Sequence, residues 1–329
     1  ERSEDIRHII TSHEQGAAHA ADGYARSTGK CGVCLATSGP GATNLVTGIA
    51  TAYMDSIPMV AITGNVPNDL LGRDSFQEVN ITGITMPITK HNFIVQNVED
   101  LAAVVRKAFV IANSGRKGPV LIDIPKDVTA AHSEYVKLPR YRIRKLPKVD
   151  DVVFEQALEV IRRAERPMIY AGGGIISSNA TRELMNFSRH MDIPICCSMM
   201  GLGSVPYDYD LYMGMLGMHG TPVSNYATLN TDLIIAIGSR FSDRVAGNRE
   251  EFGREAKIIH FDIDASEISK NVASDISIVG DARYILKKMI QRMPETKHDD
   301  WTGTLKDFKT KLGLPKPKPG ENVDPRDLA

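Results

Sequence analysis

The stretch HEQGAAHAADGYAR at residues 13–26 decides the interpretation of this sequence. Two isoleucines, Ile9 and Ile10, precede it and an alanine-rich, helix-favouring segment follows, so Glu14 stands where a strand gives way to a helix. In a doubly wound sheet, ligands bind beyond the carboxyl ends of the strands. A carboxylate that loses solvent there has a raised pKa and can hold or pass a proton near neutral pH. Alternatively, Glu14 only supports the first helical turn, where acidic side chains interact favourably with the helix dipole.

Short apolar segments alternate with helical stretches over residues 1–130. We expect strands at 6–11, 32–37, 58–63, 91–95 and 120–124, and helices at 15–27, 42–54 and 98–113. This alternation predicts an α/β fold with a doubly wound, mostly parallel sheet that carries helices on both faces.

A second α/β domain is predicted over residues 151–295, after a polar, proline-containing linker at 131–150. Its strands are expected at 167–170, 194–197, 233–237, 257–262 and 276–279, and its helices at 151–164, 180–191 and 281–293. Residues 296–329 hold a helix around Trp301 and then a Pro-Lys run, which predicts a connector to a further domain. The chain also opens in mid-pattern, so we expect a piece shortened at both ends.

Composition sets the protein class. The 329 residues suffice for about two domains, and 42% hydrophobic with 24% charged residues is ordinary for a globular protein in water. The net charge of −1 favours neither nucleic acid nor an anionic membrane, and no apolar run approaches the ~20 residues that span a bilayer. We therefore expect a cytoplasmic protein without nucleic-acid or membrane partners.

Four cysteines, Cys31, Cys34, Cys196 and Cys197, raise the question of a redox or zinc site. Cys31 and Cys34 are three residues apart in a predicted strand, so their side chains face opposite sides of the sheet and do not easily grip one metal. Cys196 and Cys197 are adjacent in another predicted strand. Buried, reduced, structural thiols are the favoured interpretation, and they suit the cytosol.

Three features of the first domain carry chemistry. The turn TSGPGATN at 37–44 has glycines that allow a ligand close to the backbone, although a tight turn without a ligand would look the same. The loop GRDSFQE at 72–78 offers Gln77 as a hydrogen-bond donor to a carbonyl or carboxylate; a solvated surface loop is the alternative. Lys90 would pair with a substrate carboxylate or serve as an edge-strand charge.

Glycine-rich or charged turns follow the strands of the second domain, at 172–174, 217–220, 238–244 and 262–264. None has the G-x-G-x-x-G spacing of the dinucleotide fingerprint. Nevertheless, Arg240 and Arg244 offer forked donors suited to a diphosphate, and Asp262 ends a strand where an acid binds a ribose hydroxyl. The combination favours a dinucleotide site over turn chemistry alone.

Taken in order, these motifs resemble the thiamine diphosphate enzymes and, more narrowly, the catalytic large subunit of acetolactate (acetohydroxyacid) synthase. The wider resemblance rests on HEQGA at 13–17, the 37–44 turn, AITG at 61–64 and the 72–78 loop. The narrower one rests on FQE at 76–78, ITKH at 88–91 and PVLIDIPKD at 119–127. The second domain resembles the family's central, Rossmann-like domain through MGLG at 200–203, MLGMHG at 215–220, residues 240–247 and FDID at 261–264.

The resemblance implies a reaction: decarboxylation of pyruvate on thiamine diphosphate and carboligation to a second 2-keto acid, pyruvate or 2-oxobutanoate. This is the first common step of valine, isoleucine and leucine biosynthesis. Glu14 matches the catalytic glutamate that bonds the aminopyrimidine and favours its imino tautomer. Gln77 faces cofactor and substrate with Phe76 beside it, and Lys90 stands at the substrate access. The matching substrate-channel positions are Pro67, Ser75 and Arg116.

The resemblance also implies a structural FAD, without net redox turnover, in the central domain. The corresponding residues are Ser56, Gly173, Gly174, Ser198, Met199, Leu216, Gly217, Met218, His219, Gly238, Ser239, Arg240, Phe241, Ser242, Asp243, Arg244, Asp262, Ile263, Asp281 and Ala282. The family holds Mg2+ and the diphosphate through a Gly-Asp-Gly motif that does not occur in these residues, so we expect the Mg2+ ligands in a missing domain and no activity from this piece alone. A homodimer or homotetramer is expected; whether a small regulatory subunit binds stays open.

Two alternatives remain at this level. Another thiamine diphosphate enzyme, a pyruvate oxidase or a 2-keto acid decarboxylase, would share Glu14, and oxygen uptake with pyruvate would reveal the oxidase. A nucleotide-binding module would use only the second domain, with Glu14 as a helix-terminal acid. Replacing Glu14 with Gln would leave such a module unaffected.

Overall fold

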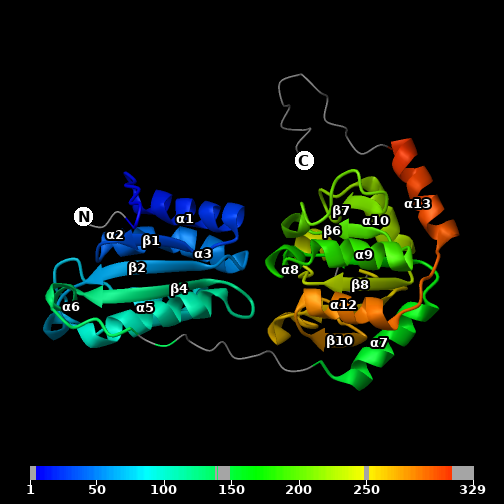
Figure 1. Cartoon of the computed structure of the whole chain (residues 1–329). Coiled ribbons are helices and arrows are strands. Elements are labelled where there is room, and N and C mark those ends of the chain that lie inside the picture. Colours follow the sequence, from blue (N-terminus) through cyan, green and yellow to red (C-terminus); the bar gives the residue numbers. More distant parts are fainter. Residues whose placement is uncertain (1–4, 138, 140–148, 248–251, 313–329) are drawn as a thin grey trace. The chain divides into compact units, whose positions relative to one another are not determined.

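The structure is a computed structural model that describes residues 5–137, 139, 149–247 and 252–312. The chain divides into two compact units, residues 1–145 and 146–329, and each is described by itself (Figure 1). Residues 138 and 140–148 of the expected linker lie outside the described residues. No helix in the part that the structure describes is both long and apolar enough to cross a membrane.

Unit 1 contains a parallel sheet, with helices on both faces. The strands, in the order β1-β2-β4-β3, are β1 (Gly32–Ala36), β2 (Met59–Asn65), β4 (Pro119–Pro125) and β3 (His91–Ile94). Its helices are α1 (Glu14–Thr28), α2 (Pro40–Asn44), α3 (Val46–Met54), α4 (Ile81–Thr85), α5 (Val98–Asn113) and α6 (Lys126–Ala130), with 3-10 turns η1 (Asn68–Leu70) and η2 (Met86–Ile88). These four strands and the α/β class confirm the prediction.

The two faces of this sheet bury different side chains. Ala18 of α1 and Ile49 of α3 pack with Cys34 on one face, whereas Ala108 of α5 packs with Val120 on the other. Cys31 lies on the α5 face, so the predicted separation of Cys31 from Cys34 is confirmed. The four cysteine thiols are free, and burial raises the pKa of Cys31 to about 11.

Two expectations for unit 1 are wrong. Residues 6–11 form no strand: Ile9 and Ile10 are 75% and 97% exposed, and none of the described strands pairs with them. A strand needs a neighbouring strand that pairs with its backbone N–H and C=O groups, and the apolar character of two isoleucines does not provide that pairing. The helix expected at 42–54 begins earlier, at Pro40, and is split at Leu45, where the N–H of Leu45 bonds to Ala42 O with tighter, 3-10 spacing.

Unit 2 contains a parallel sheet in the order β10-β9-β8-β5-β6-β7. The strands are β5 (Pro167–Ala171), β6 (Ile195–Cys197), β7 (Tyr212–Met215), β8 (Leu233–Ile237), β9 (Lys257–Asp262) and β10 (Ile276–Val279). Its helices are α7 (Asp151–Arg163), α8 (Gly173–Ser177), α9 (Thr181–Met191), α10 (Pro222–Asn230), α11 (Asp243–Ala246), α12 (Ala282–Arg292) and α13 (Asp299–Leu312), with 3-10 turns η3 (Met199–Gly201) and η4 (Ala265–Glu267).

Strand β7 was not predicted. Gly214 in its middle has φ +101°, and the register between β6 and β7 shifts at Ile195 and Cys196. A glycine at a bulge interrupts the apolar run that marks a buried strand.

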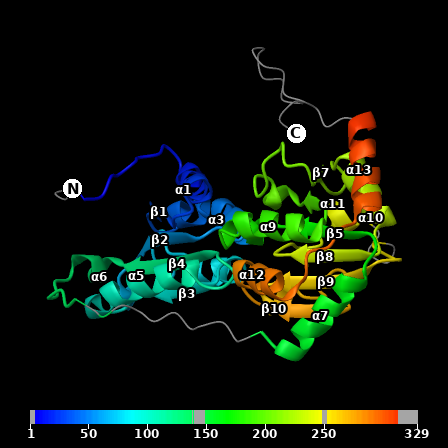
Figure 2. The ribbon, with the colours of Figure 1, turned by 45° about the vertical axis from the view of Figure 1, so that its right-hand side comes forward.

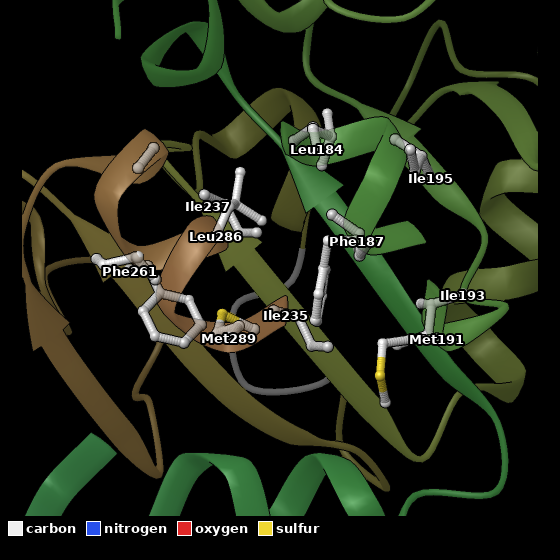
Figure 3. Close-up of a cluster of buried hydrophobic side chains, with 14 of the residues drawn as sticks. Leu184, Phe187, Met191, Ile193, Ile195, Ile235, Ile237, Phe261, Leu286 and Met289 are labelled. Atoms are coloured by element: carbon white, nitrogen blue, oxygen red, sulfur yellow. The ribbon is translucent and has the colours of Figure 1, made fainter. Parts of the chain in front are cut away.

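One face of this sheet forms the larger core. Phe187 and Met191 of α9 meet Leu286 and Met289 of α12 over the β8 side chains, as Figure 3 shows. On the other face α10 and α13 pack together, with Tyr226 and Phe308 stacked at 4.5 Å (Figure 2).

Helix α13 belongs to the fold of unit 2. Trp301 is 5% exposed, and its indole N–H donates to Pro167 O at 3.0 Å. The helix expected around Trp301 is confirmed, and residues 299–312 pack on the sheet of unit 2. Residues 313–329, including the Pro-Lys run, lie outside the described residues.

Candidate functional site

One edge of the unit 1 sheet gathers the motifs around Glu14. Because the strands are parallel, their carboxyl ends lie on the same edge, and α1 runs back from that edge to the start of β1. Glu14 is the first residue of α1, and the Nδ1 atom of His13 caps the helix by accepting from the N–H of Gln15 at 3.1 Å. The helix-terminal position predicted for Glu14 is therefore correct.

The carboxylate of Glu14 is partly exposed, and its hydrogen bond to a neighbouring amide favours its charged form. Asn44 Nδ2 donates to Glu14 Oε2 at 3.1 Å, and this bond is the main cause that holds the pKa of Glu14 below its ordinary value. The expected loss of solvent and raised pKa are wrong for this chain, because the described residues leave the carboxylate partly in water while Asn44 favours its ionised form.

The glycines of the 37–44 turn allow protein atoms to approach closely. A Cβ on Gly41 would lie 3.3 Å from Glu14 Oε1, and a Cβ on Gly39 would lie 2.5 Å from Gln77 O. Gly39 has φ +60°, a conformation that favours glycine. The turn thus joins Glu14 on one side to the loop that carries Gln77 on the other.

Loop 72–78 presents two of the expected site residues. Phe76 is 87% exposed, and Gln77 is exposed with φ +56°. Ser75 donates its hydroxyl to Leu70 O at 3.1 Å, which ties the loop to the 3-10 turn that follows Pro67. Glu14, Gln77, Phe76, Pro67 and Ser75 all belong to segments at the carboxyl edge of this sheet.

Lys90, Arg116 and Ser56 lie at the opposite edge. Lys90 precedes β3, and its ammonium donates to Ile111 O and, at 2.5 Å, to Ser114 O, which caps the carboxyl end of α5. Arg116 Nε donates to Ser56 Oγ at 2.8 Å ahead of β2 and β4. Since β4 has seven residues, about 20 Å of strand separates the two edges. Within unit 1, Lys90 is not brought together with Glu14.

A buried carboxylate within β4, two residues before its carboxyl end, is not singled out by the sequence pattern. Asp123 is 1% exposed and accepts from Thr63 Oγ1 at 2.7 Å and from Asn65 Nδ2 at 2.6 Å, while burial raises its pKa. Asn65 Oδ1 then accepts from the N–H of Val66 at 2.8 Å. The signal was an aspartate inside an apolar run, and the network it forms fixes where the chain leaves β2.

The expected dinucleotide residues of unit 2 also lie at the carboxyl edge of their sheet. Strand order reverses between β5 and β8, where doubly wound sheets bind ligands. Gly173, Gly174, Ser198, Met199, Leu216, Gly217, Met218, His219, Gly238, Ser239, Arg240, Phe241, Ser242, Asp243, Arg244, Asp262, Ile263, Asp281 and Ala282 end or follow the six strands. Ser56, in unit 1, is the exception.

Packing explains several of these glycines. A Cβ on Gly172 would lie 2.1 Å from Gly238 O, and one on Gly174 would lie 2.6 Å from Gly238 Cα. A Cβ on Gly217 would lie 2.5 Å from Arg244 O. The scaffold itself therefore requires these glycines, so they support a dinucleotide site less strongly than the motif pattern alone does.

Two of the expected contacts point into the core. Ser239 is 2% exposed and donates its hydroxyl to Tyr170 O at 3.3 Å, and the ring of Phe241 packs against His260 at 5.4 Å. Both side chains are buried beneath the turn that carries them, so their role here is structural. Arg244, in contrast, has a 69% exposed side chain, and Asp262 Oδ1 accepts from the N–H of Asp264 at 2.8 Å.

At the carboxyl edge of its sheet, unit 1 thus has an ionised carboxylate beside the loop that carries the Gln77 amide. At the carboxyl edge of its own sheet, unit 2 has arginines and an aspartate around the point where the strand order reverses. Among the described residues, no three His, Cys, Asp or Glu side chains are grouped to hold a metal.

Comparison with known proteins gives these edges a context. Residues 1–84 match the thiamine pyrophosphate enzyme N-terminal TPP binding domain, and residues 154–289 match the thiamine pyrophosphate enzyme central domain. The chain is 46% identical to an acetolactate synthase of Arthrospira platensis, over 99% of this chain and 59% of that protein. It is 48% identical to an acetolactate synthase large subunit of Corynebacterium glutamicum, over 94% and 51%, and 45% identical to a chloroplastic acetolactate synthase of Arabidopsis thaliana, over 99% and 50%.

The chain spans about half the length of the curated relatives it matches. The two domain matches follow one another in the order of the two units. The first match includes Glu14, and the second includes the point in unit 2 where the strand order reverses. The chain therefore belongs to the thiamine pyrophosphate enzymes, whose N-terminal and central domains it carries.

Proposed function

We propose that the protein containing this chain is an acetolactate synthase, which decarboxylates pyruvate on thiamine diphosphate and joins the product to pyruvate or 2-oxobutanoate. The observation that carries this proposal is the Glu14–Asn44 pair, set beside the Gly39 turn and the Gln77 loop at the carboxyl edge. Identities of 45–49% to acetolactate synthases of bacteria, archaea and plants support it.

The residues present fit thiamine diphosphate. Glu14 is ionised at neutral pH, because Asn44 bonds its charged form, and it is partly open to solvent. An ionised carboxylate can accept a hydrogen bond from a ring N–H and hold a proton at one of its oxygens. When bound, the coenzyme supplies the electron sink that decarboxylation of a 2-keto acid requires. Glu14 would set the protonation of the coenzyme's pyrimidine ring, and Mg2+ with its ligands would come from outside the described residues.

Gln77 and Phe76 would orient the substrate. The Gln77 amide is a neutral donor suited to a keto oxygen or a carboxylate, and exposed Phe76 offers an apolar surface next to it. Pro67 and Ser75 belong to the same loop system and would line the channel. Lys90 and Arg116 are about 20 Å of strand away in the same unit, so a role at substrate access would require a second copy, as in the homodimer we expect.

We infer a structural FAD for unit 2. Arg240 and Arg244 supply forked donors for its diphosphate, and Asp262 is an acceptor for a ribose hydroxyl at the strand switch. Ser239 and Phe241 would contribute only backbone, since their side chains face the core. A bound flavin would colour the purified protein yellow.

The decisive experiment is Glu14→Gln in the complete protein, assayed for acetolactate from pyruvate with thiamine diphosphate and Mg2+. Glu99→Gln is a matched control, because Glu99 is likewise an acid in the first turn of a helix, α5. We expect Glu14→Gln to abolish most of the activity and Glu99→Gln to preserve it. Equal effects of the two substitutions would mean that Glu14 only interacts with the helix dipole. Oxygen uptake with pyruvate would indicate an oxidase instead of an acetolactate synthase.

A further inference from the structure

Loop 72–78 is held in an unusual backbone conformation. Gly72 has φ +75°, Asp74 has φ +54° and Gln77 has φ +56°. A side-chain-bearing residue such as Gln77 seldom adopts positive φ unless the surrounding structure enforces it. Something in the loop must therefore supply that constraint.

The carboxylate of Glu78 folds back into its own loop and is a candidate for that constraint. One oxygen accepts from the N–H of Gly72 and the other accepts from the N–H of Ser75 at 2.9 Å. The N–H of Glu78 in turn donates to Ser75 O at 3.0 Å. Hydrogen bonds to a charged acceptor are the stronger kind, so this single side chain ties the first residue of the loop to its middle.

The opposite side of Gln77 is confined by Gly39. A Cβ at position 39 would meet Gln77 O at 2.5 Å and Gln77 Cα at 3.0 Å, so only glycine leaves room for the Gln77 backbone. The same turn lies close to Glu14, since a Cβ added at Gly41 would be 3.3 Å from Glu14 Oε1. The turn therefore lies between Glu14 and the Gln77 backbone, while Glu78 bonds to the loop that carries Gln77.

We propose that Glu78 is a positioning residue, which fixes the backbone of Gln77 against Gly39 so that the Gln77 amide meets the 2-keto acid substrate. The inference rests on the proposed function, because it needs Gln77 to contact substrate. The carboxylate of Glu78 is occupied by hydrogen bonds from backbone N–H groups, so Glu78 acts only through Gln77.

The test is a double-mutant cycle in the complete protein, with kcat and KM for pyruvate measured for Glu78→Ala, Gln77→Ala and the double variant. We expect Glu78→Ala to lower kcat/KM by about tenfold, equivalent to about 1.4 kcal/mol. We expect no further loss when Glu78→Ala is added to Gln77→Ala, because coupled residues are not additive. Asp69→Ala, an exposed acid in the preceding turn, is the control and should leave kcat/KM unchanged.

A second readout does not depend on activity. Amide hydrogen exchange at Gly72 and Ser75 should accelerate in Glu78→Ala and less so in Glu78→Gln, which keeps one carbonyl acceptor. Glu78→Gln also serves if the alanine variant fails to fold.

Several outcomes would overturn the inference. Additive losses in the cycle would mean a merely structural role, and unchanged exchange would mean that Glu78 does not hold the loop. If Gln77→Ala alone kept the full rate, or the parent enzyme made no acetolactate, the assignment of the site would fail instead, whatever Glu78→Ala did to exchange.

Discussion

Gly39→Ala tests the link between backbone geometry and the site. Gly39 has φ +60° and ψ −120°, a conformation that alanine adopts at a cost of about 1–3 kcal/mol. Its new methyl carbon would also stand 2.5 Å from Gln77 O, whereas ordinary contact begins at 3.4 Å. The difference between 3.4 and 2.5 Å means that the backbones at Gly39 and Gln77 must separate by about 0.9 Å.

A separation of that size matters if Gln77 orients the substrate, because a displacement of about 1 Å costs roughly 100-fold in rate. We expect Gly39→Ala to lower kcat/KM for pyruvate by about that factor and to lower the free energy of unfolding by about 1–3 kcal/mol. Acetolactate formation by the complete protein and chemical denaturation of the same sample measure the two effects.

Gly23→Ala is the matched control. Gly23 is in the interior of α1, where an added Cβ meets nothing within 4 Å. Alanine there should raise stability by about 0.5–1 kcal/mol and leave the rate unchanged. If Gly39→Ala had the same kcat/KM as Gly23→Ala, the argument that Gly39 positions Gln77 would be refuted.

Two further predictions concern the core and pH. Phe187→Ala should lower the free energy of unfolding of unit 2 by about 3–5 kcal/mol, because Phe187 is fully buried between α9 and the sheet, while Leu229→Ala, at an 80% exposed position, should change it by less than about 0.5 kcal/mol; urea denaturation that finds equal effects would contradict the packing. The N–H of Gly72, foremost, and that of Ser75 hold the pKa of Glu78 below 4.5. The order this carboxylate gives the loop is therefore present above pH 4.5 and lost as pH falls through the lowered pKa. The protection factor of the Ser75 amide, which corrects exchange for its intrinsic pH dependence, should fall over this range in the parent but not in Glu78→Gln.

Some elements could be read from neighbouring residues alone. Strands β8, β9 and β10 have the predicted bounds, because each is a short apolar run closed by a turn residue. Strand β7 was missed because Gly214 interrupts its run, and the strand expected at 6–11 failed because no described partner completes it. A local sequence pattern indicates the propensity to form a strand, whereas a strand forms only when it pairs with a neighbouring strand.

By itself the sequence determined the alternating α/β architecture and which residues stand at strand ends, since both depend on residues close in the chain. Only the tertiary structure decided the surroundings of those residues. Glu14 meets Asn44 from 30 residues away, Gln77 is pressed against Gly39, and Lys90 turns to the end of α5 at the other edge. Such contacts set pKa, exposure and conformation, and no local spacing encodes them because they arise when distant segments are packed together.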